Sequence, residues 1–259
     1  MDINNFVIDH VLRGTAFSQA DGSVLFTINQ IQNPSLSCTS ESTDALDALG
    51  TPIATFYRAK SAEFSAENAL FDINLLATQM GTTKKVASST SKITVPAFET
   101  IDITGASNYT LKHTPKVAPT EIYKLNSDST LGVKYTSGSS ASENSFAISG
   151  LSLTPPTGLQ NGDQLYVMYE YESESAVEVV NSAKNFPVGC KFVMEVLGCD
   201  VCDQTTQVFA YLIFDNAKLS PDFDWSIATD GAHPFSMKAQ QNYCSKDNRL
   251  FSIVIPDVE

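Results

Sequence analysis

The sequence has little charge for its length, and it lacks any excess of basic residues. Charged residues make up 17% of the 259 residues, and 29 acidic side chains outnumber 16 basic ones, which gives a net charge of −13. A chain of this kind has no basic footprint for holding nucleic-acid phosphates. Hydrophobic residues make up 42%, which is enough to fold and bury a core. These values predict a globular protein that does not bind a polyanion tightly.

The sequence also shows no pattern typical of a targeting segment or of a membrane-spanning segment. Residues 1–13 carry acidic side chains where a signal peptide would carry basic ones, and they contain no continuous apolar run. No stretch approaches the roughly 20 apolar residues that cross a bilayer. We therefore expect a protein that is made and folded in a cytoplasm, with no membrane partner.

The cysteines are few and do not form a recognisable framework. An odd number of cysteines in a cytoplasmic protein argues against obligate disulfides. A structural zinc site usually needs two close pairs of ligands, and this sequence offers one, so we expect no metal. Buried free thiols are the favoured interpretation, and a bridge from the close pair to the last cysteine, with Cys202 and Cys244 as its candidate members, stays open. The five positions are Cys38, Cys190, Cys199, Cys202 and Cys244.

Catalytic signatures are absent as well. The three histidines, His10, His113 and His233, lie in different regions, and the sequence has no nucleophile elbow and no glycine-rich phosphate loop. Glu170 and Glu172 alternate in one predicted strand, which is typical of a solvated strand face rather than of paired catalytic carboxylates. We therefore predict that the chain is not an enzyme, has no catalytic, metal-binding or cofactor-binding residues, and needs no cofactor.

What the sequence does contain is strand signals, together with one helix candidate. Residues 23–31 alternate apolar and polar side chains as a half-buried strand does, and residues 53–57 predict a second short strand. Residues 38–50, between them, are polar and predict a loop. Residues 65–80 place apolar side chains at helical spacing, with Ser65 as a candidate N-cap and Gly81 as the C-terminal glycine, which predicts a helix.

The middle of the chain has a different texture. After a polar linker at residues 82–91, residues 93–171 contain many short strand signals, separated by Gly, Pro, Asn and Ser at intervals of about 8–12 residues. This spacing is typical of a small β-sandwich. Because no Cys…Trp…Cys pattern is present, we expect it to be Ig-like in architecture only.

The last third returns to longer strands. Residues 190–197, 206–214 and 250–255 are continuous apolar runs, which favour strands that are buried on both faces or lie in a subunit contact. We therefore expect residues 1–92 and 176–259 to pair into one core domain. Residues 93–175 would form a domain inserted into it, since insertions are tolerated in exposed loops.

Three stretches of this sequence look familiar as a set. They are FVIDHVLRGTAFSQADGSVLFTINQI, GTPIATFYRAKSAEFSAENALFDINLLATQMGT, and VFAYLIFDNAKLSPDFDWSIATDGAHPF followed by YCSKDNRLFSIVIPD. They resemble the tail tube proteins of tailed bacteriophages, in which an Ig-like insertion often occupies the middle of the chain. The resemblance implies a mainly β fold: a tail-tube-like β-sandwich or barrel with one flanking helix, plus an inserted Ig-like β-sandwich.

The same resemblance implies a function and partners. Tail tube proteins form homo-hexameric rings that stack into a tube, through which phage DNA is delivered to the host. The partners would be further copies of the chain, a sheath or terminator protein and the baseplate or initiator complex, with DNA only as passing cargo. The protein would be located in the virion tail, after assembly in the host cytoplasm.

Two alternatives remain open at this point. One is another virion structural protein, such as a head-decoration or neck protein, which would share the β-rich and non-enzymatic character. The other is a module that binds a host receptor or carbohydrate, for which Tyr169 and Tyr171 would be the aromatic candidates. Both tyrosines fall on the apolar face of their predicted strand, which favours a place in the core instead.

Overall fold

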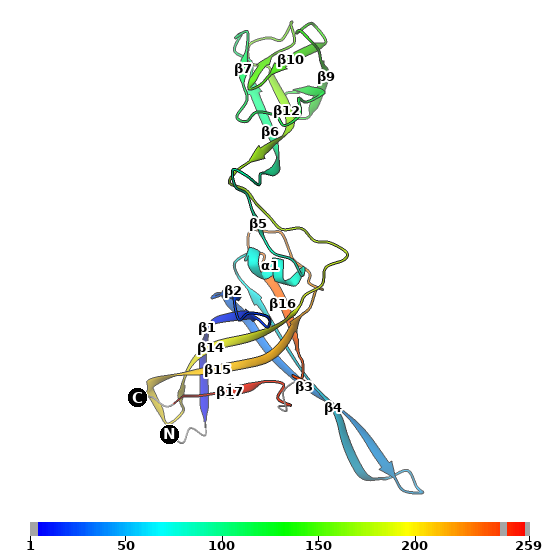
Figure 1. Ribbon diagram of the computed structural model, residues 1–259, viewed down its shortest axis with the longest axis vertical. Coiled ribbons are helices and arrows are strands. Elements are labelled where there is room, and N and C mark those ends of the chain that lie inside the picture. The colour runs from blue at the N-terminus through cyan, green and yellow to red at the C-terminus, as the bar shows by residue number, and fades with distance from the viewer. Residues whose placement is uncertain (1–4, 244–247, 257–259) are drawn as a thin grey trace. The chain divides into compact units, whose positions relative to one another are not determined.

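The computed structural model describes residues 5–243 and 248–256 of the chain. The fold is mainly β, and the described residues contain one short helix. The chain divides into two compact units (Figure 1): unit 1 combines Met1–Lys84 with Val179–Glu259, and unit 2 is Lys85–Glu178. Within the described residues, no helix is long and apolar enough to cross a membrane.

Unit 1 is built on an eight-stranded sheet. Seven strands follow the order β2-β1-β14-β15-β16-β4-β3, and β17 pairs with β15 beside this path. All the pairings in this sheet are antiparallel. The strands are β1 (Phe6–Ser18), β2 (Val24–Ile28), β3 (Ile31–Leu46), β4 (Pro52–Asn68), β14 (Gly189–Asp200), β15 (Asp203–Leu219), β16 (His233–Ala239) and β17 (Ser252–Val254).

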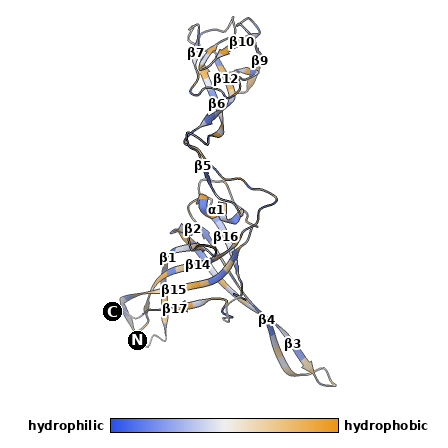
Figure 2. Ribbon diagram, viewed as in Figure 1, coloured by the Kyte–Doolittle hydropathy of each residue, from blue (hydrophilic) through white to orange (hydrophobic). Residues whose placement is uncertain are grey.

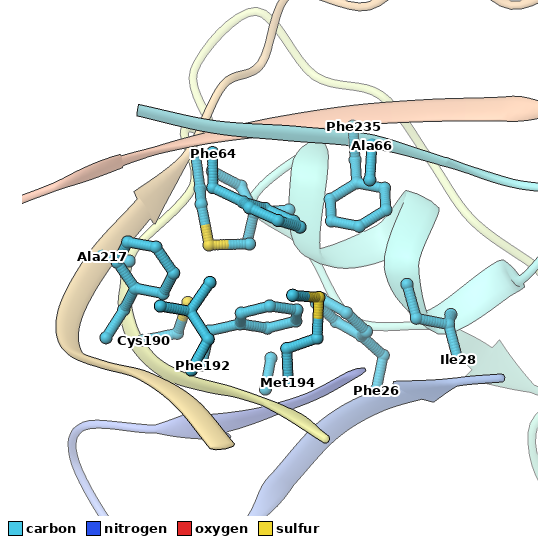
Figure 3. Close-up of a cluster of buried hydrophobic side chains, with 14 of the residues drawn as sticks. Phe26, Ile28, Phe64, Ala66, Cys190, Phe192, Met194, Ala217 and Phe235 are labelled. Atoms are coloured by element: carbon cyan, nitrogen blue, oxygen red, sulfur yellow. The ribbon is translucent and has the colours of Figure 1, made fainter. Parts of the chain in front are cut away.

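The sheet curves over a core that is rich in phenylalanine. Figure 3 shows Phe64 on one side of this core facing Phe192 and Phe26 on the other. Phe64 lies on β4 and Phe192 on β14, which are not neighbours in the sheet, so the two ends of the strand order are folded toward each other in a near-barrel. The ring centroids of Phe64 and Phe192 are 5.7 Å apart. Burial of each such side chain stabilises the fold by about 1.5–3 kcal/mol.

The helix, α1 (Ile73–Gln79), is shorter than the sequence pattern predicts. Its N-cap is Asp72, whose carboxylate accepts hydrogen bonds from the backbone N–H groups of Asn74 and Leu75 at 2.9 and 2.7 Å. The predicted start at Ser65 is wrong, because Ser65 lies in β4 and pairs with Ser236 of β16. The flanking helix is therefore present, but the first quarter of its predicted length, residues 65–68, belongs to a strand.

The predicted end of the helix is confirmed. Gly81 has a φ of 65° and its N–H donates to the carbonyl of Thr78 at 3.1 Å, while the next N–H reaches the carbonyl of Ala77 at 2.9 Å. A Cβ at this position would lie 2.3 Å from the backbone of Phe186. Glycine is therefore required both by the left-handed conformation and by the close approach of the chain.

The predicted loop at residues 38–50 is also wrong. Most of it is strand, because β3 runs to Leu46 and pairs with β4 nearly along its whole length. The two strands form a long hairpin that leaves the rest of unit 1 as a two-stranded ribbon (Figure 1). The sequence hides this strand because its side chains are mostly Ser, Thr and Asp, with few apolar positions to show alternation.

Unit 2 is built on a seven-stranded sheet in the order β6-β12-β8-β9-β10-β11-β7. One pairing, β9 with β10, is parallel. A separate two-stranded sheet joins β5 and β13 at the ends of the unit. The strands are β5 (Lys85–Val86), β6 (Ile93–Asp102), β7 (Tyr109–Thr110), β8 (Glu121–Leu125), β9 (Leu131–Ser137), β10 (Ser145–Ser149), β11 (Ser152–Thr154), β12 (Gln164–Ser173) and β13 (Val177–Glu178).

Unit 2 has its own core, and one carboxylate is buried in it. Ile122, Phe146 and Leu165 are fully buried at its centre. Glu99 on β6 is 5% exposed; it accepts the hydroxyl hydrogen of Tyr169 and the backbone N–H of Lys112 at 3.0 Å. Because a buried carboxylate must be hydrogen-bonded, this contact fixes the segment after β7 against β6 and β12.

Candidate assembly surface

The distal part of the β3–β4 hairpin, residues 37–61, is here called the distal ribbon. None of its residues is buried, and Ala45 is the one residue that is even half-buried. β4 is buried nearer the core, where Ala62 is 2% exposed and Phe64 is 1% exposed, whereas β3 has no buried residue. The ribbon therefore begins where β4 leaves the core, and both of its faces are open.

The turn at the tip of the ribbon is well defined. The carboxylate of Asp47 accepts the backbone N–H groups of Leu49 and Thr51, each at 2.8 Å. These hydrogen bonds, that from Thr51 first, lower the pKa of Asp47 below its usual value. Gly50 has a φ of 83°, which closes the turn at no steric cost. The tip is an ordered feature of the hairpin, because its polar backbone groups are satisfied locally.

Side-chain hydrogen bonds also link the two strands of the ribbon. The hydroxyl of Thr55 donates to Asp44 at 2.7 Å, and the hydroxyls of Thr39 and Ser61 lie 2.7 Å apart. The pairing shifts register between Thr39 and Glu41, opposite Ala59, whose φ is 49°. A bulge of this kind increases the local twist of a hairpin.

Hydrophobic residues occur at several positions along this exposed ribbon (Figure 2). A two-stranded hairpin is marginally stable by itself in water, and an exposed apolar edge is a template for pairing with another chain. β3 lies at the end of the strand order, so its outer edge is also open. The ribbon is therefore a surface that favours a partner. Its large apolar residues and their exposed fractions are Leu46 56%, Leu49 91%, Ile53 69%, Phe56 54% and Tyr57 73%.

The charges of the ribbon are nearly balanced. Three acidic residues lie on β3 and in the turn, and two basic residues lie on β4. With this balance the ribbon lacks the concentration of positive charge that binds nucleic-acid phosphates. Its chemistry suits a protein surface with apolar pockets and strand edges. The charged residues are Glu41, Asp44, Asp47, Arg58 and Lys60.

The cysteines are scattered over unit 1. Cys190 is fully buried, and burial raises the pKa of its thiol to about 11, so this thiol is unreactive. Cys38 lies on the ribbon and is exposed, and Cys202 is exposed in the turn between β14 and β15. Cys244 lies outside the described residues. The expected bridge between Cys202 and Cys244 therefore stays a prediction.

The histidines lie at three separate places. His10 is exposed, with Nδ1 2.9 Å from a carboxylate oxygen of Asp9. His113 stacks on Tyr171 at a centroid distance of 3.8 Å. His233 is fully buried, and its Nε2 lies 2.7 Å from Oε1 of Gln79. The structure brings no two of these histidines together.

The described residues contain no group of three or more His, Cys, Asp or Glu side chains that could hold a metal ion. Glu170 and Glu172 lie on the exposed face of β12, as the alternation predicts. On the opposite face of this strand, Tyr169 is buried and Tyr171 is half-buried against the core. These two tyrosines therefore do not form an exposed platform for a sugar.

The ribbon is the site that sequence reasoning missed. Its apolar residues Ile53, Phe56 and Tyr57 were visible, but they predicted a short strand rather than half of a long hairpin. The pairing of β4 with a Ser- and Thr-rich partner strand is a long-range property, which local periodicity does not contain. The tip contains no Asn-Gly or Asp-Gly pair, which is the strongest local signal of a hairpin.

A mainly β fold, a near-barrel unit and an exposed β-ribbon together are compatible with the class of β-rich structural proteins. The comparisons agree with this class. The model of the YomU/Tube protein family matches residues 6–248, and the chain belongs to this family. The resemblance to phage tail tube proteins is thereby confirmed: the chain is a tube-type structural protein of a phage virion. No curated protein matches the chain.

Proposed function

We propose that this chain assembles with copies of itself into hexameric rings that stack into the tail tube of a phage. The observation that carries the proposal is the distal ribbon, which exposes apolar side chains on an ordered hairpin. A chain that belongs to a tube family and presents such a ribbon has an evident partner in the next copy. The ribbon would lie against the sheet of a neighbouring subunit, and the open edge of β3 would extend its pairing.

The charge of the chain supports a role in conducting DNA. Double-stranded DNA carries about one charge per 1.7 Å of its axis, so a basic wall would bind it by counterion release and retard its passage. The chain has a net charge of −13. We infer that acidic side chains line part of the bore and let DNA slide through without a strong contact.

The remaining partners follow from this place in the virion. A tube needs a baseplate or initiator complex at one end, and a terminator or a surrounding sheath elsewhere, so further tail proteins would contact the rings. Unit 2 would be an Ig-like insertion, with residues 93–175 as its expected bounds and residues 1–92 and 176–259 as the tube core. The role is structural, with assembly in the host cytoplasm before the tail joins the virion.

The test shortens the ribbon without disturbing the core. Ser42 and Tyr57 are directly paired, so residues 43–56 can be replaced by Asn-Gly, which closes a two-residue hairpin. Wild-type protein should form rings and tubes in negative-stain electron micrographs at high concentration. The shortened variant should stay folded by circular dichroism and remain monomeric in analytical ultracentrifugation.

A matched control separates the ribbon from exposed apolar surface in general. Val180 is 54% exposed in unit 1 and lies outside the ribbon, so Val180→Ser should still form tubes. Wild-type protein that stays monomeric, with or without its tail initiator complex, would contradict the tube proposal. Tubes formed equally well by the shortened variant would show that another surface drives assembly.

A further inference from the structure

The outward face of the unit 2 sheet carries a group of aromatic side chains that the core does not use. We call Phe98, Tyr123, Tyr166 and Met168 the aromatic face. Phe98 is 62% exposed, and the other three are half-buried. Their neighbours along each strand point inward, since Ala97 and Tyr169 pack with the core of unit 2. The aromatic face therefore differs from the polar exterior that such strands usually show, and exposed apolar patches of this kind mark interaction sites.

These side chains come together across three neighbouring strands. Phe98 on β6 is paired with Met168 on β12, and Tyr166 on β12 is paired with Tyr123 on β8. The rings of Phe98 and Tyr166 are nearly parallel, with an interplanar angle of 12° and centroids 6.4 Å apart. Antiparallel pairing on both sides of β12 holds the four side chains next to one another on one face of the sheet.

A cavity borders this surface. It has a volume of about 260 Å³ and is lined by residues of the β7–β8 connection and of the sheet, among them Val117, Pro119, Glu121, Met168 and Glu170. Met168 thus belongs both to the cavity and to the aromatic face. The phenolic hydroxyl of Tyr123 donates to Glu121 at 2.6 Å, which ties the carboxylate at the cavity to the rings.

The polar groups around the rings are mainly hydrogen-bond acceptors. The carboxylate of Glu170 makes no hydrogen bond or ion pair to the described residues. The carboxylate of Glu121 forms one ion pair, in which its Oε2 lies 3.5 Å from Nζ of Lys134. The unpaired carboxylate oxygens of Glu170 can accept hydrogen bonds from hydroxyl groups, and they repel phosphate or sulfate groups. The charge of the site therefore disfavours an anionic polymer and suits a neutral ligand that carries many hydroxyls.

A protein partner fits this face less well. A stable protein interface buries about 800 Å² on each partner, which takes about 20–30 residues a side. The apolar part of this face consists of four side chains. Strand addition at the neighbouring edge is disfavoured, because Pro96 lies in the edge strand β6 and cannot donate a backbone hydrogen bond. Both observations favour a small, repeating ligand over a protein.

We propose that the aromatic face of unit 2 is a binding site for an uncharged glycan. The C–H faces of a hexose or N-acetylhexosamine would pack on Phe98 and Tyr166, since aromatic ring faces carry partial negative charge and are apolar. Hydroxyl groups of the sugar would donate to Glu121 and Glu170 in the adjoining cavity. The site lies in unit 2 and is separate from the ribbon, so it adds surface recognition to a structural chain.

The experiment uses the full-length chain on an array of uncharged hexose and N-acetylhexosamine oligosaccharides, with sulfated versions of the same backbones. The wild type should bind at least one uncharged group and none of its sulfated versions. The double variant Phe98→Ala/Tyr166→Ala should lose at least tenfold in binding signal. Tyr243→Ala, which removes a 90% exposed tyrosine of unit 1, should bind as the wild type does.

A second measurement needs no variant. Hydrogen exchange of the wild type with its best oligosaccharide should slow at backbone amides of β6, β8 and β12. Absence of glycan binding, binding that survives the double variant, or protection confined to other strands would each overturn the proposal. A change of oligomeric size in the double variant, without glycan binding by the wild type, would identify the face as a protein interface instead.

Discussion

The ribbon of unit 1 and the sheet of unit 2 differ in how far their residues are buried and paired. In unit 2, the strands pack on a core of their own. Even the buried carboxylate of Glu99 has hydrogen-bond partners from two other segments. In unit 1, β3 and β4 continue past the core as a hairpin on which no residue is buried. The first pattern gives a unit whose buried polar groups are paired within it, and the second leaves an exposed surface of the kind that another chain can cover.

The largest expected effect separates the two ends of a single strand. Phe64 and Phe56 both lie on β4, but Phe64 is 1% exposed in the core and Phe56 is 54% exposed on the ribbon. Phe64→Ala should lower the free energy of unfolding by about 3–5 kcal/mol, because it leaves a cavity. Phe56→Ala should change it by less than about 0.5 kcal/mol.

Urea denaturation of dilute, unassembled protein measures both values, with fluorescence of Trp225 as the probe of unit 1. Phe56→Ala should instead weaken tube formation in electron micrographs. Equal losses of stability in the two variants would mean that the ribbon packs on its own unit, and the contrast between the two ends of β4 would fail.

The second prediction concerns the buried contact in unit 2. Tyr169 donates to Glu99, and its oxygen accepts the backbone N–H of His113 at 3.1 Å. Tyr169→Phe removes both partners' hydrogen bonds and should lower the free energy of unfolding by about 1–3 kcal/mol. Near-UV circular dichroism of the tyrosines during denaturation measures the loss.

The matched control is Tyr171→Phe, two residues further along the same face of β12. The hydroxyl of Tyr171 makes no hydrogen bond to the described residues, so this change should be nearly neutral. If both variants lose the same stability, the effect comes from the repacking of the ring and not from the Glu99 contact.

The sequence predicts some of these features and hides others. The mainly β fold and the two faces of β12 follow from alternation, because Leu165, Val167 and Tyr169 are the buried members of that strand. Gly81 could be predicted as the end of a helix, since few other residues adopt its conformation. The helix start could not, because Phe64 and Ala66 continue a strand alternation into a segment that also has helical spacing.

The candidate site was harder to predict, for a physical reason. The ribbon depends on the pairing of residues that are up to 22 positions apart, such as Thr39 with Ser61, and no local pattern contains this pairing. The burial of Glu99 is equally hidden, since its partners Lys112 and Tyr169 come from distant segments. Local periodicity specifies which face of a strand is apolar, but not what lies opposite that face.

Alkaline pH provides a third comparison of the units. Burial, together with the hydrogen bond to Glu99, raises the pKa of Tyr169 to about 12. The neutral phenol is therefore favoured in the folded state. Its contribution to stability is present below the unfolded pKa of about 10, and it is lost as the pH rises through about 12. Unit 2 should lose stability over this range, and Tyr169→Phe should remove that part of the loss, as tyrosinate absorbance and circular dichroism would show.

The smallest effect is expected at mildly acidic pH, in unit 1. His233 is fully buried, its Nε2 contacts Gln79, and its Nδ1 has no hydrogen-bond partner among the described residues. Burial lowers the pKa of His233, and the nearby carboxylate of Asp72 opposes this shift only in part. Because the folded pKa lies below the unfolded value of about 6.5, the contribution of His233 to stability is complete above that value and falls as the pH drops through the folded pKa.

The melting temperature of the wild type, followed by Trp225 fluorescence, should therefore fall by a few degrees between pH 7 and pH 5. His233→Gln, which cannot be protonated, should show a smaller fall over the same range, while the exposed His113→Gln should behave as the wild type does. An identical pH dependence in all three proteins would assign the acid sensitivity to carboxylates elsewhere, and it would show that the buried histidine of unit 1 does not couple folding to pH.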